Sequence, residues 1–326
     1  MKVIVTGALG HIGSKLVREV AKTHPGAEII MIDDLSTQRF ASLFDLPRTS
    51  KFRFVESDVT KMDIAPYLSG VDAVIHLAAI TNATESFANK DRVETINFNA
   101  TRNVAKACAT NETPLVYVSS TSVYGTQKNI VDENCSEDEL QPQSPYAETK
   151  LREERLVQEL GKTDGLKYTI CRFGTIFGVS PGMRFHTAVN KFCWQAVRGE
   201  AVTVWRTALH QVRPYLDLED AVAALQFIVK GRHFYNEIYN VLTLNATVDQ
   251  ILSTIRERVS ELKVRYVDTQ IMNQLSYHVS TKKFLEMGFS YKGDLKRGIS
   301  ETLSLLQQCY TLTEETGHED SIKQSA

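Results

Sequence analysis

The stretch VIVTGALGHIG, residues 3–13, decides how the rest of the sequence is interpreted. Its first residues, Val3–Thr6, form an apolar, β-branched run that is typical of a buried strand, and Ile12–Lys22 repeats apolar residues at helical spacing. The strand and the helix are separated by the glycines Gly7, Gly10 and Gly13. A glycine-rich turn between a strand and a helix favours a dinucleotide site, because its amides can approach the phosphates.

Each position of this turn has an expected role. Gly7 makes the tight turn, Gly10 lets the backbone approach a pyrophosphate, and Gly13 lets the helix pack close to the strand. His11 and Ile12 open the helix, whose amides and dipole favour phosphate groups. The alternative is a glycine-rich turn without a ligand, and the flanking strand and helix count against it.

Strand and helix patterns alternate through the first half of the chain. Long helical patterns at Ile12–Lys22 and Arg92–Thr110 lie between short strand-like runs, most of them apolar on both faces as in a buried parallel sheet. The runs are Val3–Thr6, Glu28–Ile32, Phe52–Val55, Val74–Leu77, Leu115–Ser119 and Lys167–Cys171. The alternation predicts an α/β fold with a Rossmann-type, doubly wound parallel sheet.

The pattern becomes less regular after about residue 175. We expect helices at Thr187–Arg198, Leu218–Lys230, Thr247–Val259 and Leu295–Gln308, and strands at Val202–Trp205, Glu237–Val241 and Val264–Val267. The dinucleotide-binding domain would span residues 1–175, with return segments from about 210–240. A smaller mixed α/β lobe for the substrate would span 176–310, and the polar residues 311–326 would form a disordered tail.

Asp33 closes the second predicted strand, about twenty residues beyond the glycines. A carboxylate there can accept hydrogen bonds from the adenosine ribose and would repel the additional phosphate of NADP. Arg39, the nearest cation, lies too far along the chain to favour NADP, so the sequence predicts NAD. Asp34 is the alternative carboxylate, and the expected contact segment is Asp33, Asp34, Leu35 and Ser36.

Tyr146 and Lys150 are four residues apart, directly after Ser144-Pro145. If a helix begins there, both side chains share one face, and the ammonium lowers the pKa of the tyrosine. Such a tyrosine can take a proton from an alcohol as hydride leaves the carbon. The pair alone is a common chance match. However, the hydroxyls of Ser119–Ser122 follow the fifth strand, at the sheet edge where ligands bind, unless they only satisfy their own loop.

These motifs occur together in an order that resembles one family. They are TGALGHIG, Asp33-Asp34, Ser57-Asp58-Val59, His76-Leu77-Ala78-Ala79, Asn97, SSTSVYG, Tyr146-Ala147-Glu148-Thr149-Lys150, Arg172-Phe173-Gly174-Thr175 and Val212-Arg213-Pro214-Tyr215. Over roughly residues 1–310, the sequence resembles the extended short-chain dehydrogenase/reductase family. Within that family it is similar to the NAD-dependent nucleotide-sugar epimerase/dehydratase group, which includes UDP-glucose 4-epimerases.

The resemblance implies the remaining site residues. The catalytic set would be Ser120, which bonds the substrate hydroxyl, Tyr146 as the base, and Lys150, which also binds the nicotinamide ribose. Further cofactor contacts would be Asp58, Val59, Leu77, Ala78, Ala79, Thr81, Asn97 and Phe173. Contacts to a nucleotide-sugar substrate would be Ser120, Thr121, Ser122, Tyr146, Thr175, Arg184, Arg206 and Arg213, with Arg213 at the diphosphate.

Departures from the family pattern narrow the reaction. Dehydratases of the group carry an Asp-Glu pair before VYG and related decarboxylases a Glu, whereas this chain has Thr121-Ser122. Because elimination of water needs that carboxylate, the sequence favours an epimerase that inverts C4 of an NDP-hexose through a transient 4-keto intermediate. Leu275 stands near the place of a missing family arginine, and Arg184 or Arg206 would supply its phosphate contact or be surface charges.

Composition argues against several classes of function. A net charge of −2 and a pI of about 6.5 give no basic surplus for nucleic acid or a membrane surface. No apolar run is long enough to span a bilayer. Five scattered cysteines favour free thiols, and the histidines show no metal spacing, so no metal is expected. We expect a cytoplasmic protein and, as is common in the resembling family, a homodimer through helices near 92–110 and 146–160.

Other functions remain as alternatives. An NDP-sugar 4-dehydrogenase, dehydratase or decarboxylase would use the same site but release a different product. A non-catalytic NAD-binding sensor would keep the fold without the chemistry, and the presence of Ser120, Tyr146 and Lys150 counts against it. UDP-glucose/galactose is the default substrate pair because it is the commonest in the resembling group.

Overall fold

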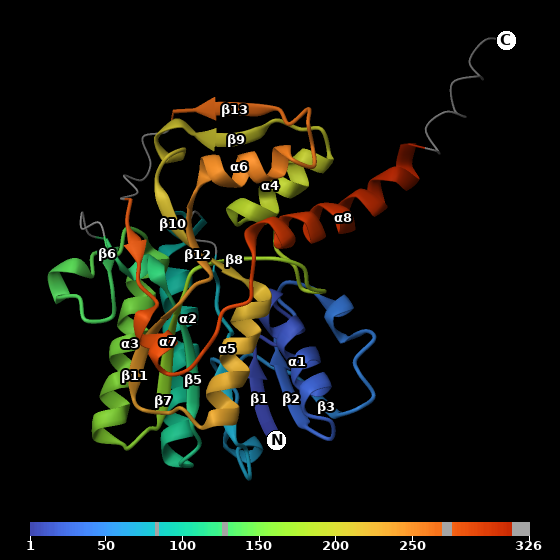
Figure 1. Cartoon of the computed structure of the whole chain (residues 1–326). Helices are drawn as coiled ribbons and strands as arrows, with labels where there is room; N and C mark the ends of the chain where they lie inside the picture. Colours follow the sequence, from blue (N-terminus) through green and yellow to red (C-terminus); the bar gives the residue numbers. More distant parts are fainter. Residues whose placement is uncertain (82–84, 126–129, 269–275, 315–326) are drawn as a thin grey trace.

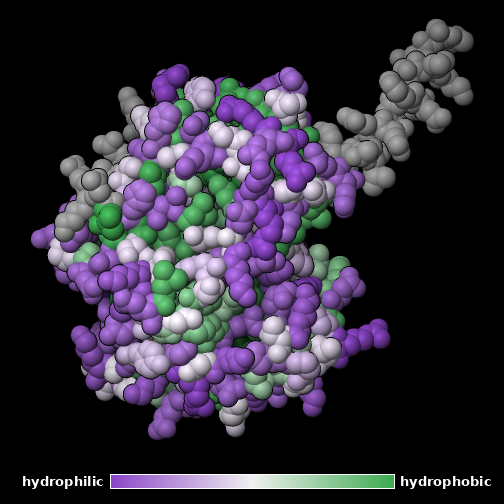
Figure 2. All heavy atoms as spheres, viewed as in Figure 1, coloured by the Kyte–Doolittle hydropathy of each residue, from purple (hydrophilic) through white to green (hydrophobic). Residues whose placement is uncertain are grey.

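The computed structural model describes residues 1–81, 85–125, 130–268 and 276–314. It has two parts: a parallel sheet with helices on both faces, and a smaller lobe above the carboxyl ends of the strands (Figure 1). In the same view the surface is mainly hydrophilic, and hydrophobic side chains show chiefly in the band between the two parts (Figure 2). No helix within the described residues is long and apolar enough to cross a membrane.

The main sheet contains, within the described residues, seven parallel strands in the order β11-β7-β5-β4-β1-β2-β3. They are β1 (Lys2–Thr6), β2 (Glu28–Asp33), β3 (Lys51–Glu56), β4 (Ala73–His76), β5 (Leu115–Ser120), β7 (Tyr168–Phe173) and β11 (Glu237–Val241). The strand order reverses between β1 and β4, which is where such sheets bind ligands. The predicted α/β class with a Rossmann-type sheet is confirmed.

Helices cover both faces of this sheet. Apolar stripes explain the packing, since Leu16 and Val20 of the first helix and Val104 and Val157 of the second and third are almost completely buried. On one face lie α1 (His11–Thr23) and α5 (Leu218–Gly231); on the other lie α2 (Lys90–Thr110) and α3 (Pro145–Thr163).

The lobe has its own hydrophobic core, with Phe177, Val202, Ile251 and Leu303 at its centre. Its helices are α4 (Ala188–Val197), α6 (Val248–Arg256) and α8 (Leu295–Glu314). Its strands are β8 (Thr175–Phe177), β9 (Val202–Trp205), β10 (Val212–Asp217), β12 (Leu244–Thr247) and β13 (Val264–Val267), paired as β12-β10-β8 and β13-β9. Beside the sheet domain lie β6 (Ile130–Val131), β14 (His278–Val279) and α7 (Lys282–Glu286).

The sequence patterns did not predict the small sheet β12-β10-β8. Its strands have three to six residues, and β10 contains Pro214, which cannot donate to a ladder. β10 pairs with β8 in parallel and with β12 in antiparallel orientation, so the sheet joins segments that are distant in sequence. Such pairing depends on the tertiary fold and leaves little local signal.

Two helices bear on earlier expectations, one about the C-terminal tail and one about the homodimer. Helix α8 continues to Glu314, so the predicted tail is not disordered from residue 311; residues 315–326 lie outside the described part. Leu151 lies in the helix near 146–160 that is predicted for dimerisation, but it is 6% exposed and packs in the chain's own core with Val123 and Tyr124. The homodimer therefore stays a prediction that Leu151 does not support.

A buried ion pair joins α3 to the sheet. Arg172 on β7 donates to both carboxylate oxygens of Glu154, with Nη2–Oε2 at 2.6 Å and Nε–Oε1 at 3.0 Å. Its Nη1 donates to the Tyr124 hydroxyl at 2.9 Å. The Arg172 and Glu154 side chains are 2% and 1% exposed, so neither can recover solvation if its partner is removed.

Replacing Glu154 with Gln should therefore destabilise the protein by about 3–5 kcal/mol, because Arg172 would remain buried without a counter-charge. Denaturant unfolding followed by circular dichroism measures this change. The control is Glu94→Gln, which removes the partner of Arg152 on the surface and should change stability by less than about 1 kcal/mol. Equal effects of the two substitutions would contradict the assigned role of the pair.

Candidate active site

The glycine turn is shaped by close backbone contacts. Gly7 has a φ of +65°, and a Cβ on it would lie 2.7 Å from the Ala78 amide nitrogen. A Cβ on Gly13 would lie 2.4 Å from the Gly7 carbonyl oxygen. These two positions therefore admit only glycine. Gly10 is tight only towards the Gly7 carbonyl, and across from it stands Arg184, whose guanidinium nitrogen would be 3.8 Å from a Cβ.

The His11 ring turns away from the glycine turn. Its Nε2 lies 3.0 Å from the Gly178 carbonyl oxygen, and burial lowers its pKa to about 4. The neutral His11 ring therefore contacts Gly178, in the segment that enters the lobe. Any phosphate contact at this point falls to the backbone amides of His11 and Ile12, as expected for a helix N-terminus.

Asp33, at the end of β2, faces the glycine turn, and Asp34 does not. Asp33 accepts hydrogen bonds from the amides of Leu9 and Leu35, each at 3.1 Å. Burial raises the pKa of Asp33, and these two amides oppose the rise. Asp34 is exposed and accepts from the Ser36 amide at 3.0 Å. Of the two alternatives, Asp33 is the one positioned for an adenosine ribose.

The segment after β4 forms the other wall of the turn. Leu77, Ala78, Ala79 and Thr81 are all partly exposed there. Asn97 on α2 is fully buried; its Oδ1 accepts from the Ile80 amide at 2.8 Å, and its Nδ2 donates to the Ile80 carbonyl at 2.9 Å. Asn97 therefore supports the backbone of this segment, which is consistent with the supporting role expected from the resemblance.

Two arginines converge on the glycine turn. Arg184, in the segment between β8 and α4, donates to the Thr81 hydroxyl. Burial lowers its pKa to about 10, and the nearby Arg39 adds to the effect. The Arg184 Nε and Arg39 Nη1 atoms are buried without a hydrogen-bond partner in the described part of the chain. Two enclosed guanidinium groups beside helix amides suit a diphosphate, so the turn fits a dinucleotide.

Arg39 was missed as a candidate ligand. In the sequence, Arg39 bears only on NADP recognition and lies too far along the chain to favour it. In the structure it approaches both Asp33 and Arg184. A basic residue in the loop after the ribose-binding carboxylate is the only sequence signal that pointed to it.

Ser120, Tyr146 and Lys150 come together at the carboxyl end of β5. Ser120 ends that strand, and Tyr146 and Lys150 occupy the first turns of α3, which Ser144 caps by accepting from the Ala147 amide at 3.2 Å. The Ser120 side chain lies close enough to the Tyr146 hydroxyl to lower the pKa of the phenol. The arrangement can hold an alcohol between Ser120 and Tyr146.

The net shift of the Tyr146 pKa is upward, contrary to the expected lowering. Burial of the phenol is the largest cause, and the Glu153 carboxylate adds to it. Lys150, Arg184 and the Ser120 side chain all act in the expected direction and lower the pKa, but burial outweighs them.

The two hydroxyls that follow Ser120 have different surroundings. Thr121 donates from Oγ1 to the Phe173 carbonyl at 3.2 Å and is 4% exposed. Ser122 Oγ is buried and has no hydrogen-bond partner among the described residues. Ser122 is therefore the better placed of the two to bond a substrate, and Thr121 serves mainly its own backbone.

Arg213 and Arg206 occupy different environments. Arg213 on β10 packs over the Tyr277 ring at 5.3 Å, and burial lowers its pKa. The Tyr277 hydroxyl donates to the Thr121 carbonyl at 3.2 Å, so Arg213 is linked through Tyr277 to the carboxyl end of β5. Arg206 is 62% exposed and pairs with Asp268 at 3.3 Å on the surface of the lobe. The structure thus brings Arg213, and not Arg206, into the enclosed part of the site.

The remaining predicted contacts lie at the edges of the site. Asp58, after β3, accepts from the Thr60 amide and hydroxyl, which lowers its pKa, and Val59 is buried in the core. Phe173 ends β7 and is 4% exposed within the core beside α1 and α5. Thr175 begins β8, where it pairs with β10.

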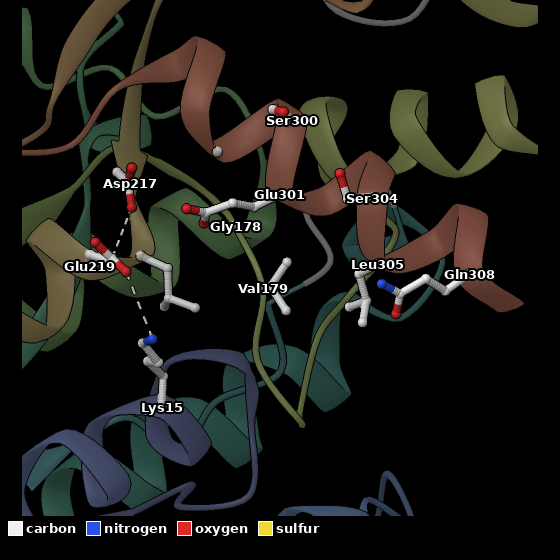
Figure 3. Close-up of a pocket in the computed structure, with 12 residues that line it drawn as sticks. Lys15, Gly178, Val179, Asp217, Glu219, Ser300, Glu301, Ser304, Leu305 and Gln308 are labelled. Atoms are coloured by element: carbon white, nitrogen blue, oxygen red, sulfur yellow. Dashed lines mark hydrogen bonds and ion pairs between the residues drawn. The ribbon is translucent and has the colours of Figure 1, made fainter. Parts of the chain in front are cut away.

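A cavity of about 500 Å³ lies elsewhere, between α1, α5 and α8. Figure 3 shows Lys15, Glu219 and Glu301 around it, with Lys15 paired to Glu219 at 3.9 Å. None of the predicted site residues lines it. Among the described residues, no group of His, Cys, Asp and Glu has the arrangement of a metal site.

The fold and the site together define a dinucleotide-binding α/β protein with a Ser–Tyr–Lys set at the sheet edge. Comparison with known proteins agrees: residues 3–241 match the model of the NAD-dependent epimerase/dehydratase family. The chain therefore belongs to that family, which confirms both the resemblance seen in the sequence and NAD as the cofactor.

Curated relatives include both epimerases and dehydratases. An uncharacterised UDP-glucose epimerase of Bacillus subtilis, YtcB, is 28% identical over 323 residues, covering 95% of this chain and 99% of that protein. A trifunctional UDP-glucose 4,6-dehydratase of Arabidopsis thaliana is 26% identical over 318 residues, or 94% of this chain. The chain spans about half the length of this plant protein, of which the match covers 47%.

Solved structures share the whole fold. MoeE5, in complex with UDP-glucuronic acid and NAD, has a TM-score of 0.81 and 25% identity, with 95% of this chain and 100% of that chain covered. The UDP-glucuronic acid 4-epimerase of Bacillus cereus, in complex with UDP-glucuronic acid and NAD, has a TM-score of 0.83 and 24% identity over the same shares.

Replacing Arg184 or Arg39 with Gln should weaken NAD binding by about 10- to 100-fold, since a hydrogen bond to a charged group contributes about 1.5–3 kcal/mol. Calorimetric titration of NAD into cofactor-free protein measures the change. Arg206→Gln is the matched control and should leave the NAD dissociation constant unchanged. Unaltered NAD affinity in both test variants would show that the two guanidinium groups do not bind the cofactor.

Proposed function

We propose that this protein is an NAD-dependent epimerase that inverts C4 of a UDP-hexose through a transient 4-keto sugar. The observation that carries the proposal is the enclosed set of Ser120, Tyr146 and Lys150 next to hydroxyl side chains instead of a carboxylate. The names of the relatives support a uridine nucleotide sugar, since YtcB is called a UDP-glucose epimerase and MoeE5 binds UDP-glucuronic acid or UDP-glucose.

The three side chains divide the proton chemistry. NAD, when bound beside the glycine turn, would supply the acceptor and donor of the hydride. Tyr146 takes the proton of the C4 hydroxyl, and Ser120 holds that hydroxyl and the resulting carbonyl oxygen by hydrogen bonding. The Lys150 ammonium stabilises the phenolate. After the sugar turns its other face, Tyr146 gives the proton back to the oxygen.

The site lacks the acid/base group that elimination of water requires. The resembling dehydratases carry carboxylates where Thr121 and Ser122 stand. The nearby carboxylates of α3, Glu153 and Glu154, are buried and bonded to Tyr117 and Arg172, so neither is free to act on a substrate. The arrangement favours proton transfer at one hydroxyl over loss of a hydroxyl group.

The lobe closes on the glycine turn in a way that suits a retained cofactor. A Cβ on Gly182 would lie 2.3 Å from the Leu9 carbonyl oxygen, and the Gly182 amide donates to Ser14 Oγ at 3.0 Å. With Arg184 two residues further on, this segment covers the place of the diphosphate. An epimerase regenerates its NAD at each turnover and gains from such retention, whereas a dehydrogenase must exchange it.

A dehydratase is the second candidate, because a bovine dTDP-glucose 4,6-dehydratase and the Arabidopsis protein are among the relatives, each 26% identical. A 4-dehydrogenase or a non-catalytic NAD-binding sensor would share the fold. In each case the product, or its absence, distinguishes the candidate from an epimerase.

Incubation with UDP-glucose, UDP-galactose or UDP-glucuronic acid should interconvert C4 epimers without added cofactor, because hydride leaves and returns at one carbon. Nuclear magnetic resonance identifies the product, and GDP-, CDP- and dTDP-sugars test the choice of base. A 4-keto-6-deoxy product would favour a dehydratase, and growth of NADH absorbance would favour a dehydrogenase.

Replacing Tyr146 with Phe should lower kcat by about 10²–10⁴-fold, the usual contribution of a positioned acid or base. NAD affinity should change little, because the ring remains. Tyr235→Phe, at an exposed hydroxyl bonded to His233, is the matched control and should keep full activity. Survival of epimerisation in Tyr146→Phe would show that another group is the base.

A further inference from the structure

Glu153 is a fully buried carboxylate directly behind the catalytic lysine. It lies on α3, three residues after Lys150, and is 0% exposed. Its Oε2 accepts from the Tyr117 hydroxyl at 2.6 Å and lies 3.3 Å from the Lys150 ammonium. Its Oε1 accepts from the Thr101 hydroxyl at 2.7 Å. Both oxygens therefore accept hydrogen bonds, as an ionised carboxylate does.

The other hydrogen bonds of Thr101 fix which atoms donate and which accept in the chain that leads to Glu153. The Thr101 hydroxyl donates to Glu153, so the His76 Nε2 at 3.2 Å from its oxygen must be the donor in that contact. His76 Nδ1 then accepts from the Thr6 hydroxyl at 2.7 Å. Burial lowers the pKa of His76 to about 3, which keeps the ring neutral in this chain.

Lys150 is enclosed by oxygen atoms on its inner side. Its ammonium donates to the Tyr117 hydroxyl and to the Val118 carbonyl, each at 3.1 Å, in addition to its contact with Glu153. Burial and Glu153 raise the pKa of Tyr117 well above its ordinary value, so this phenol stays protonated and bridges the two charges. Lys150 thus acts on Tyr146 with a charge that Glu153 partly cancels.

Other charged groups around this cluster are few and identifiable. On α3, Glu154 is paired with Arg172 of β7. From the segment after β8, Arg184 faces Tyr146 and lowers its pKa, in the opposite sense to Glu153. The described elements packed against the cluster also place the neutral His76 and the protonated Tyr117 there.

We propose that Glu153 is a positioning residue of the active site, which holds Lys150 by its ammonium group and attenuates the charge that Lys150 presents to Tyr146. Glu153 thereby sets the pH range in which the tyrosine works as a base. The proposal rests on the proposed role of Tyr146 in proton transfer.

The test is Glu153→Gln, which keeps the shape of the side chain and removes its charge. The Tyr146 phenolate should then form more readily. In a plot of kcat against pH, the acidic limb should therefore move to lower pH. At a fixed pH on that limb, the retained fraction of maximal rate should rise about three- to tenfold, because each pH unit corresponds to a factor of ten. A merely structural residue would lower kcat without moving the limb.

A second measurement does not depend on turnover. The tyrosinate difference spectrum of NAD-loaded protein, with that of Tyr146→Phe subtracted, reports the titration of Tyr146 alone. It should shift to lower pH in Glu153→Gln. If no sugar is epimerised, this spectrum still tests Glu153, so failure of the proposed function is distinguishable from failure of this inference.

Two further variants complete the design. Glu148→Gln removes a charge from the exposed face of the same helix, where Glu148 pairs with Lys90 at 3.4 Å, and should leave the titration of Tyr146 in place. If Glu153→Gln does not fold, Tyr117→Phe removes the bridge between Lys150 and Glu153. The ammonium should then approach the carboxylate more closely, and the limb should move to higher pH. An unmoved titration of Tyr146 in whichever variant folds would overturn the proposal.

Discussion

A buried hydrogen-bond chain connects the glycine turn to α3, and the rest of the candidate site depends on it. The Thr6 hydroxyl, at the end of β1, accepts from the Leu77 and Ala78 amides and donates to His76 on β4. Through Thr101 and Glu153 the chain reaches Lys150. Since a buried polar group without a partner costs about 1–3 kcal/mol, the chain fixes β1, β4, α2 and α3 relative to one another.

Local sequence patterns were sufficient to predict the features that depend on residues near one another in the sequence. Gly7 and Gly13 are required by the turn itself, as the close approaches of Gly7 to Ala78 and of Gly13 to the Gly7 carbonyl show. The apolar runs of the sheet and the spacing of Tyr146 and Lys150 likewise carry their own signal, because a buried parallel strand and a helix face have fixed periods. The sequence pattern also gave Asp33 and Asp34 as candidates for the carboxylate that binds the ribose. Only the structure of the turn after β2 shows that Asp33 is the one that faces the glycine turn.

Features that depend on tertiary packing could not be predicted in the same way. Arg39 approaches Arg184 only because the lobe segment folds back over the glycine turn. Glu153 resembles an ordinary charged residue in a helix rich in Glu and Arg, and only the packing of α3 against β5 and α2 encloses it. The net rise of the Tyr146 pKa has the same origin, since spacing shows the charge of Lys150 but not the burial that outweighs it.

The end of β5 carries hydroxyl side chains at the place where the resemblance to dehydratases implies a carboxylate. Thr121 donates to the Phe173 carbonyl, and its own carbonyl accepts from Tyr277, which packs against Arg213. A carboxylate at this position would place a second acceptor against the Phe173 carbonyl, in a pocket where Thr121 is 4% exposed. Such a buried, mismatched charge is unfavourable. The Thr121 hydroxyl is therefore part of the pairing between β5 and β7, and an Asp at this position would lose the hydrogen bond to the Phe173 carbonyl.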